Sequence, residues 1–225
     1  MNVSSRDMTN TIAVFVADSA YDMTQTSKII ADISEIVFQT LKNKGILQRM
    51  YIEELLSQKT NLQQIKSVVS WASGSRDNFK MLWGFARSDD RRTSVNALWK
   101  MTHLQKTDVK CIVSLRDEMI DMLLAETDTG KKRMLLQLLR EQEYAADDIR
   151  TDFLDYCLSK INSECEPYAV RGYCIYAAYK MCRHFPELLS ELEEHLDMMQ
   201  YQPLSPGLKS ALRQTKSNIT KLRKQ

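Results

Sequence analysis

Hydrophobic residues along the last two thirds of this chain recur at three- and four-residue spacing, within stretches separated by short polar turns. Such spacing places the apolar side chains on one side of a helix. The pattern returns about every 38 residues, because Val95, Met134, Val170 and Leu208 occupy equivalent places that are 39, 36 and 38 residues apart. Each helix pair has one side too apolar to be left in water, so neighbouring pairs are expected to stack. The pattern therefore predicts an all-α chain, an α-α superhelix of stacked antiparallel helical hairpins.

Four hairpins are expected between residues 76 and 225. The predicted pairs are 77–87 with 91–104, 113–125 with 131–142, 148–161 with 167–184, and 186–199 with 206–222. Turns this short make the two helices of a pair antiparallel neighbours.

Residues 1–75 are expected to form a less regular helical cap of one solenoid that covers residues 1–225. Residues 1–25 fit either a short helix or a frayed arm. From Ser27 the apolar spacing becomes regular, and Gly45 stands where a left-handed helix cap belongs. Two further amphipathic segments are expected at 46–56 and 62–71.

The repeat resembles the HEAT-repeat branch of the armadillo-like superfamily. That family's hairpin carries an acid in its turn, an apolar residue five places later, then an Arg or Lys, then a small residue. The matches are Asp90, Val95 and Ala97 in the first hairpin, Val170-Arg171-Gly172 in the third and Leu208-Lys209-Ser210 in the fourth. The departures are Asn96 and Leu135 at the basic place, Asp128 one place early, and Cys165 and Pro203 at the acidic place. The resemblance spans about residues 76–225 and implies a HEAT-like solenoid that serves as a scaffold or binds proteins or peptides, with no reaction.

Composition agrees with an intracellular chain. The five cysteines contain no Cys-x-x-Cys pair, and the spacing of Cys157, Cys165, Cys174, Cys182 and His184 matches no zinc-site pattern. The segment 12–17 is too short to span a bilayer and has no basic segment before it. We therefore expect a cytoplasmic protein without a cofactor, a metal or a membrane partner; its oligomeric state stays open.

One candidate partner-binding set is aromatic. The second helices line the concave side in HEAT-like solenoids, and such a groove would use amphipathic aromatic residues. Alternatively, the tyrosine rings lie between neighbouring helices as structural wedges. The candidates are Trp99, His103, Tyr173, Tyr176, Tyr179, Lys180 and Arg183.

Basic residues favour a second reading, a nucleic-acid partner. Two successive turns carry Arg91-Arg92 and Lys131-Lys132-Arg133, which would form one basic ridge for phosphates. DNA-alkylation-repair glycosylases are HEAT-like solenoids with aromatic, acidic and basic residues on the concave face, and these residue types occur here at Trp83, Asp89, Asp90 and Trp99. The sequence has no Gly-rich phosphate loop, His-Glu-x-x-His or Gly-x-Ser-x-Gly motif. A non-catalytic protein- or peptide-binding module is therefore the preferred reading, with the DNA-binding glycosylase as the alternative.

Overall fold

A computed structural model describes residues 23–43, 45–105, 108 and 113–224, and within these ranges the regular elements are helices without a strand. The chain forms two compact units, Met1–Tyr51 and Ile52–Gln225. The expected extent of a single solenoid over residues 1–225 therefore stays a prediction. No described helix is both long enough and apolar enough to cross a membrane.

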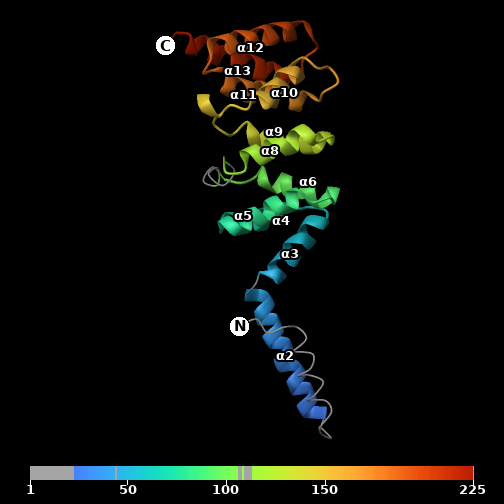
Figure 1. The fold of residues 1–225 in the computed structure, drawn as a ribbon. Coiled ribbons are helices and arrows are strands. Elements are labelled where there is room, and N and C mark those ends of the chain that lie inside the picture. The colour runs from blue at the N-terminus through green and yellow to red at the C-terminus, as the bar shows by residue number, and fades with distance from the viewer. Residues whose placement is uncertain (1–22, 44, 106–107, 109–112, 225) are drawn as a thin grey trace. The chain divides into compact units, whose positions relative to one another are not determined.

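The first unit contains the helix α2, Met23–Asn43 (Figure 1). Gly45 follows it with a φ of 68°, the left-handed conformation expected for a helix cap. The helix α3, Ile46–Ser57, then runs across the boundary between the two units. The sequence left open whether residues 1–25 form a short helix or a frayed arm. Residues 1–22 of this segment lie outside the described residues.

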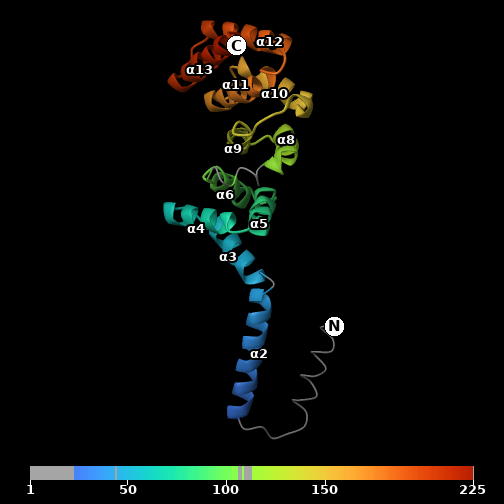
Figure 2. The same cartoon turned by 90° about the vertical axis from the view of Figure 1, so that its left-hand side faces the viewer.

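The second unit continues with α4, Leu62–Ser73, and then contains four helix pairs that follow one another along the chain (Figures 1 and 2). Short 3-10 helices, η2 at Ala146–Asp148 and η3 at Met199–Tyr201, lie in the connections. The pairs are α5 (Arg76–Ala86) with α6 (Arg91–Met101), α8 (Arg116–Ala125) with α9 (Thr129–Leu139), α10 (Thr151–Ile161) with α11 (Tyr168–Cys182), and α12 (Pro186–Met198) with α13 (Pro206–Leu222).

The pairs stack so that helices of one kind pack against each other. Among the second helices, α9 packs against both α6 and α11, and α11 also packs against α13; among the first helices, α10 packs against α8 and α12. We call α6, α9, α11 and α13 the second layer, and α5, α8, α10 and α12 the first layer. The all-helical hairpin stack predicted from the apolar spacing is confirmed.

The apolar core lies between the layers and includes three of the four residues used to define the repeat. Met134, Val170 and Leu208 are buried, whereas Val95 is only half-buried. Thr93, two residues before Val95 in α6, is buried, with 5% of its surface exposed. Val95 nevertheless packs against the core, and Ala97, the small residue of the same repeat motif, is fully buried. The four residues that define the repeat lie on successive second helices.

Acidic or hydroxyl side chains cap the starts of three second helices, with Asp90 at α6, Asp128 at α9 and Ser205 at α13. Asp90 accepts a hydrogen bond from the backbone N–H of Thr93, and Asp128 accepts from those of Gly130 and Lys131. These caps satisfy N–H groups that have no partner within the helix. Hydrogen bonds from the Thr93 side chain and backbone lower the pKa of Asp90 below its ordinary value.

Hydrogen bonds between residues about one repeat apart join a second helix to the end of an earlier helix. The Nδ2 atom of Asn96 donates to the Leu56 carbonyl at 2.6 Å, and Lys180 Nζ donates to the Gln142 carbonyl at 2.8 Å. Both acceptors lie at or just beyond the end of a helix, where carbonyl groups lack intrahelical donors. The polar residues of one repeat thus complete the helix ends of the repeat before it.

Candidate binding face on the second helices

One side of each second helix points away from the core. Residues four and seven places apart share a side of a helix, and on this basis we define the second-layer face. It comprises Arg92 and Trp99 of α6 with His103 just beyond that helix, Arg133 and Gln137 of α9 with Arg140 at its C-cap, Tyr173, Tyr176 and Lys180 of α11, and Gln214 and Lys221 of α13. All of these residues are half-buried or exposed.

The centre of this face is a cluster of two tyrosines around one arginine. The Arg140 guanidinium carbon lies 4.9 Å from the centre of the Tyr173 ring and 5.2 Å from that of the Tyr176 ring. Such distances allow cation–π attraction to both rings. The Tyr173 hydroxyl donates to Gln137 Oε1 at 3.4 Å, and the Tyr176 hydroxyl donates to Gln214 Oε1 at 3.2 Å. The cluster therefore ties α9, α11 and α13 together while both rings stay half-buried.

The other predicted residues of α11 are engaged in the stack. Lys180 and Arg183 form ion pairs with the Glu143 carboxylate at 3.1 and 3.0 Å. Burial acts to raise the pKa of Glu143, but hydrogen bonds and charge from Lys180 and Arg183 outweigh it and lower that pKa below its ordinary value. Tyr179 is half-buried and packs against the core. These residues support the tyrosine cluster from one end.

Trp99 and His103 form a second part of the face, on α6 and just beyond its end. Their rings meet edge to face, with centres 5.7 Å apart, and His103 Nδ1 lies 2.8 Å from the Trp99 carbonyl oxygen. His103 also borders a pocket of about 670 Å³ between α4 and the segment after α6. The other lining residues are Leu62, Ile65, Lys66, Val69, Ser70, Ser73, Gly74, Gln105 and Asp108.

Three of the five residues predicted to bind phosphate make contacts within the chain. Arg91 pairs with Asp128 at 2.6 Å, and Lys131 lies 3.5 Å from Glu126 with 14% of its side chain exposed. Arg92 donates to the Ser57 carbonyl at 3.4 Å. Lys132 and Arg133 follow Lys131 directly, so the three side chains point to different sides of α9. Two of the five, Arg92 and Arg133, lie on the second-layer face.

The acidic residues and tryptophans considered for a glycosylase have different surroundings in the structure. Asp90 caps α6, as expected for an acid at the turn, and Asp89 beside it is exposed. Trp83 is buried with 4% of its surface exposed, and its Nε1 donates to Glu118 at 2.8 Å. Trp99 is half-buried on the second-layer face. Within the described residues, no three His, Cys, Asp or Glu side chains are placed to hold a metal ion.

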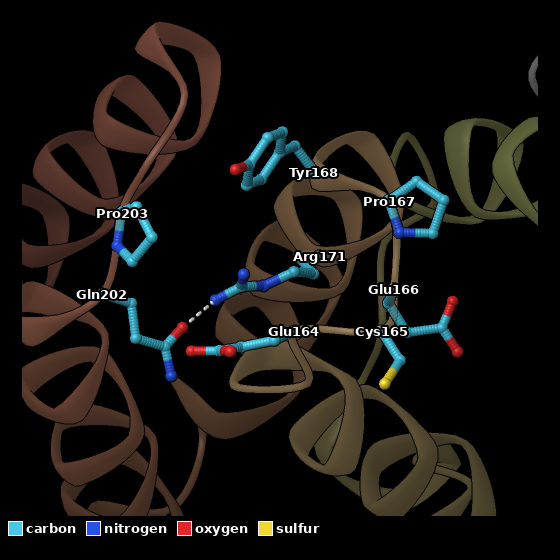
Figure 3. A pocket seen from close by; sticks show the side chains of 8 residues that line it. All are labelled: Glu164, Cys165, Glu166, Pro167, Tyr168, Arg171, Gln202 and Pro203. Atoms are coloured by element: carbon cyan, nitrogen blue, oxygen red, sulfur yellow. Dashed lines mark hydrogen bonds between the residues drawn. The ribbon is translucent and has the colours of Figure 1, made fainter.

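A pocket of about 430 Å³ lies at the turn edge between α10–α11 and the connection from η3 to α13, beside the buried Arg171 (Figure 3). Arg171 has 1% of its surface exposed, and its Nε donates to the Ile161 carbonyl at 2.8 Å. A second N–H donates to Gln202 Oε1, so the guanidinium joins two repeats. Figure 3 shows Glu164 beside this pair and the Cys165 sulfur turned away from it. Burial lowers the pKa of Arg171, and the charge of Glu164 opposes that shift.

The sequence analysis missed Arg140 and Gln202, although both leave a signal. Gln137 and Arg140 lie 36 residues before Tyr173 and Tyr176, which is one of the observed repeat lengths. Comparing each aromatic residue with the position one repeat away would have found the cluster. The repeat expects an acid at the place of Pro203, and the polar Gln202 stands one residue before it. Asp128 likewise stands one residue before the place where an acid is expected. A search one residue upstream of the expected place would therefore have found Gln202.

Comparison with family models matches residues 52–219 to the HEAT repeat domain. The match covers most of the chain, so this protein belongs to the HEAT repeat domain family. It begins at residue 52, earlier than the resemblance described from residue 76. No curated protein matches the chain at the threshold of the comparison.

Proposed function

We propose that this protein is a non-catalytic, cytoplasmic scaffold that binds a protein or peptide on its second-layer face. The observation that carries the proposal is the cluster of Tyr173, Arg140 and Tyr176. Tyr and Arg are the residue types that dominate binding energy at protein interfaces, especially where their geometry is fixed before binding.

Two features of the cluster support a partner-binding role in addition to a structural one. Both rings are half-buried, so a partner can cover the surface that remains. The Tyr–Gln hydrogen bonds hold the rings in place, which reduces the entropy lost when a partner binds. The amide groups of Gln137 and Gln214 also offer donors to a peptide backbone. Together these features favour an extended or helical segment lying across α9, α11 and α13.

The test is a selection of peptides from a displayed random library on the whole protein, followed by measured affinities for variants. Tyr176→Ala should weaken binding of the selected peptides by about 2 kcal/mol, because it removes a central aromatic contact. Tyr201→Ala is the matched control, since Tyr201 is 91% exposed and lies in η3, outside the second-layer face. The control should bind like the unmodified protein.

Stability must be measured on the same variants by chemical denaturation. Binding that survives Tyr176→Ala, together with a large loss of unfolding free energy, would assign the rings to a structural wedge and reject the proposal. Failure to select any peptide would also reject it.

A further inference from the structure

Charge in the second unit is divided between the two helix layers. The second-layer helices α6, α9, α11 and α13 contain no Asp or Glu, although each contains Lys or Arg. The first-layer helix α8 carries Asp117, Glu118 and Asp121, and α12 carries acidic residues from Glu187 to Asp197. We infer that the partner of the second-layer face is an acidic peptide segment, a step that rests on the proposed function.

Part of this positive charge is explained by contacts within the chain. Arg91 and Lys216 pair with Asp128 and Asp197, and Lys180 pairs with Glu143. Among the described residues, however, no ion pair or hydrogen bond is found for the exposed side chains of Arg133, Lys209, Arg213 and Lys221. Arg133 and Lys221 lie on the second-layer face, on either side of the tyrosine cluster, and Arg92 on that face bonds only to a carbonyl. The cations on this face that lack a carboxylate partner are available to an anionic partner.

Helix stability does not account for this arrangement. The amino-terminal end of a helix has a positive potential, so acids in the first turn stabilise it and cations there do the opposite. The first turns of α6, α9 and α13 lack acids and contain Arg91, Arg92, Lys131, Lys132 and Lys209. The capping carboxylates of Asp90 and Asp128 offset the cations of α6 and α9, but α13 has the neutral cap Ser205, so helix stability does not favour Lys209 in its first turn.

The spacing of the available cations favours a peptide over a nucleic acid. Arg92, Arg133 and Lys221 are on three different helices, and Glu143 borders the same face. A phosphate backbone carries a charge at each nucleotide, and its affinity grows with the number of phosphates that Lys and Arg neutralise. An acidic peptide with apolar residues can instead place single carboxylates at separate cations and its apolar side chains on Tyr173 and Tyr176.

The test uses the selected peptides of the previous experiment and copies in which each Glu or Asp is replaced by Gln or Asn. The double variant Arg133→Glu with Lys221→Glu reverses two charges on the second-layer face. The matched control is Arg76→Glu with Lys80→Glu, which makes the same change of net charge on exposed residues of the first-layer helix α5. Fluorescence anisotropy reports the affinities, and sedimentation at low salt reports self-association.

We expect the selected peptides to be rich in Glu and Asp, and their neutral copies to bind about tenfold more weakly. The second-layer variant should lose about tenfold in affinity for the acidic peptides, while the control should be unchanged. Selected peptides that are neutral, or neutral copies that bind equally well, would overturn the inference but leave the proposed function standing. Tighter binding of duplex DNA than of any peptide, or self-association abolished by the second-layer variant, would also overturn it.

Discussion

The first and second layers of the helical stack contribute alike to the core but differ at their surfaces. Buried apolar residues come from both, as Leu123 and Leu158 on one side and Leu136 and Ala177 on the other illustrate. Only the first layer carries acidic residues in its helices, with α12 the most acidic. The core therefore requires the apolar pattern and leaves the sign of the surface charge free. Some second-layer cations have a structural role. The remaining difference in charge between the two layers is evidence about the partner that binds there.

The largest expected effect comes from a second-layer cation that the fold requires. Arg171→Ala should lower the unfolding free energy by about 3–5 kcal/mol, because it leaves the Ile161 carbonyl and the Gln202 amide without their donor in a buried site. Chemical denaturation measures the change. The control is Arg213→Ala on exposed α13 surface, expected to stay within about 0.5 kcal/mol. Equal effects of the two changes would remove the distinction between structural and available cations.

Lys100 is a buried second-layer cation of a different kind. It is 0% exposed, its Nζ donates to Thr60 Oγ1 at 3.0 Å, and no carboxylate of the described residues lies within ion-pair distance. Burial lowers its pKa from 10.5 to about 8. Below pH 8 the lysine is charged in both states, and burying that charge opposes folding. As the pH rises from 8 to 10.5 the folded state has released the proton and the unfolded state still holds it, so stability rises.

We therefore expect Lys100→Met to raise the unfolding free energy at pH 7 by about 1–3 kcal/mol. The gain should shrink as the pH is raised from about 8 to 10.5, the range set by the two pKa values. Denaturation curves at pH 7 and at alkaline pH, for the variant and for Lys80→Met on exposed α5 surface, give the comparison. A constant difference between Lys100→Met and the unmodified protein at all pH values would contradict the assignment of a buried, unpaired lysine.

The fold could be predicted from the sequence because each helix pair carries its own local signals. Apolar spacing located the helices, and α13 begins and ends at the predicted residues, Pro206 and Leu222. Some helix ends were less accurate: α8 begins at Arg116, three residues later than expected, and α6 ends at Met101, three residues earlier. The apolar pattern continues beyond both ends, so it could not mark them.

The candidate face was less accessible to sequence reasoning, because it depends on contacts between helices. The tyrosines of α11 stood out by composition, but the position of Arg140 against both rings requires the register of α9 against α11. The phosphate-binding hypothesis joined Arg91-Arg92 and Lys131-Lys132-Arg133 because the two groups stand at successive turns of the repeat. Adjacent helical residues point in different directions, so the turn position alone does not determine which of these side chains lie on the second-layer face.

The smallest change in unfolding free energy is expected at Arg133 and Lys221, two cations of the second-layer face that have no carboxylate partner among the described residues. Arg133→Gln and Lys221→Gln should each change the unfolding free energy by no more than about 0.5 kcal/mol, because their side chains are exposed and charge–charge contacts at the surface contribute little. Lys180→Gln should cost about 1–2 kcal/mol, since Lys180 donates to the Gln142 carbonyl and pairs with Glu143. Thermal or chemical denaturation of the three variants separates the two groups. If Arg133 and Lys221 proved as important to stability as Lys180, the fold itself would explain their charge, and the acidic partner would lose its main support.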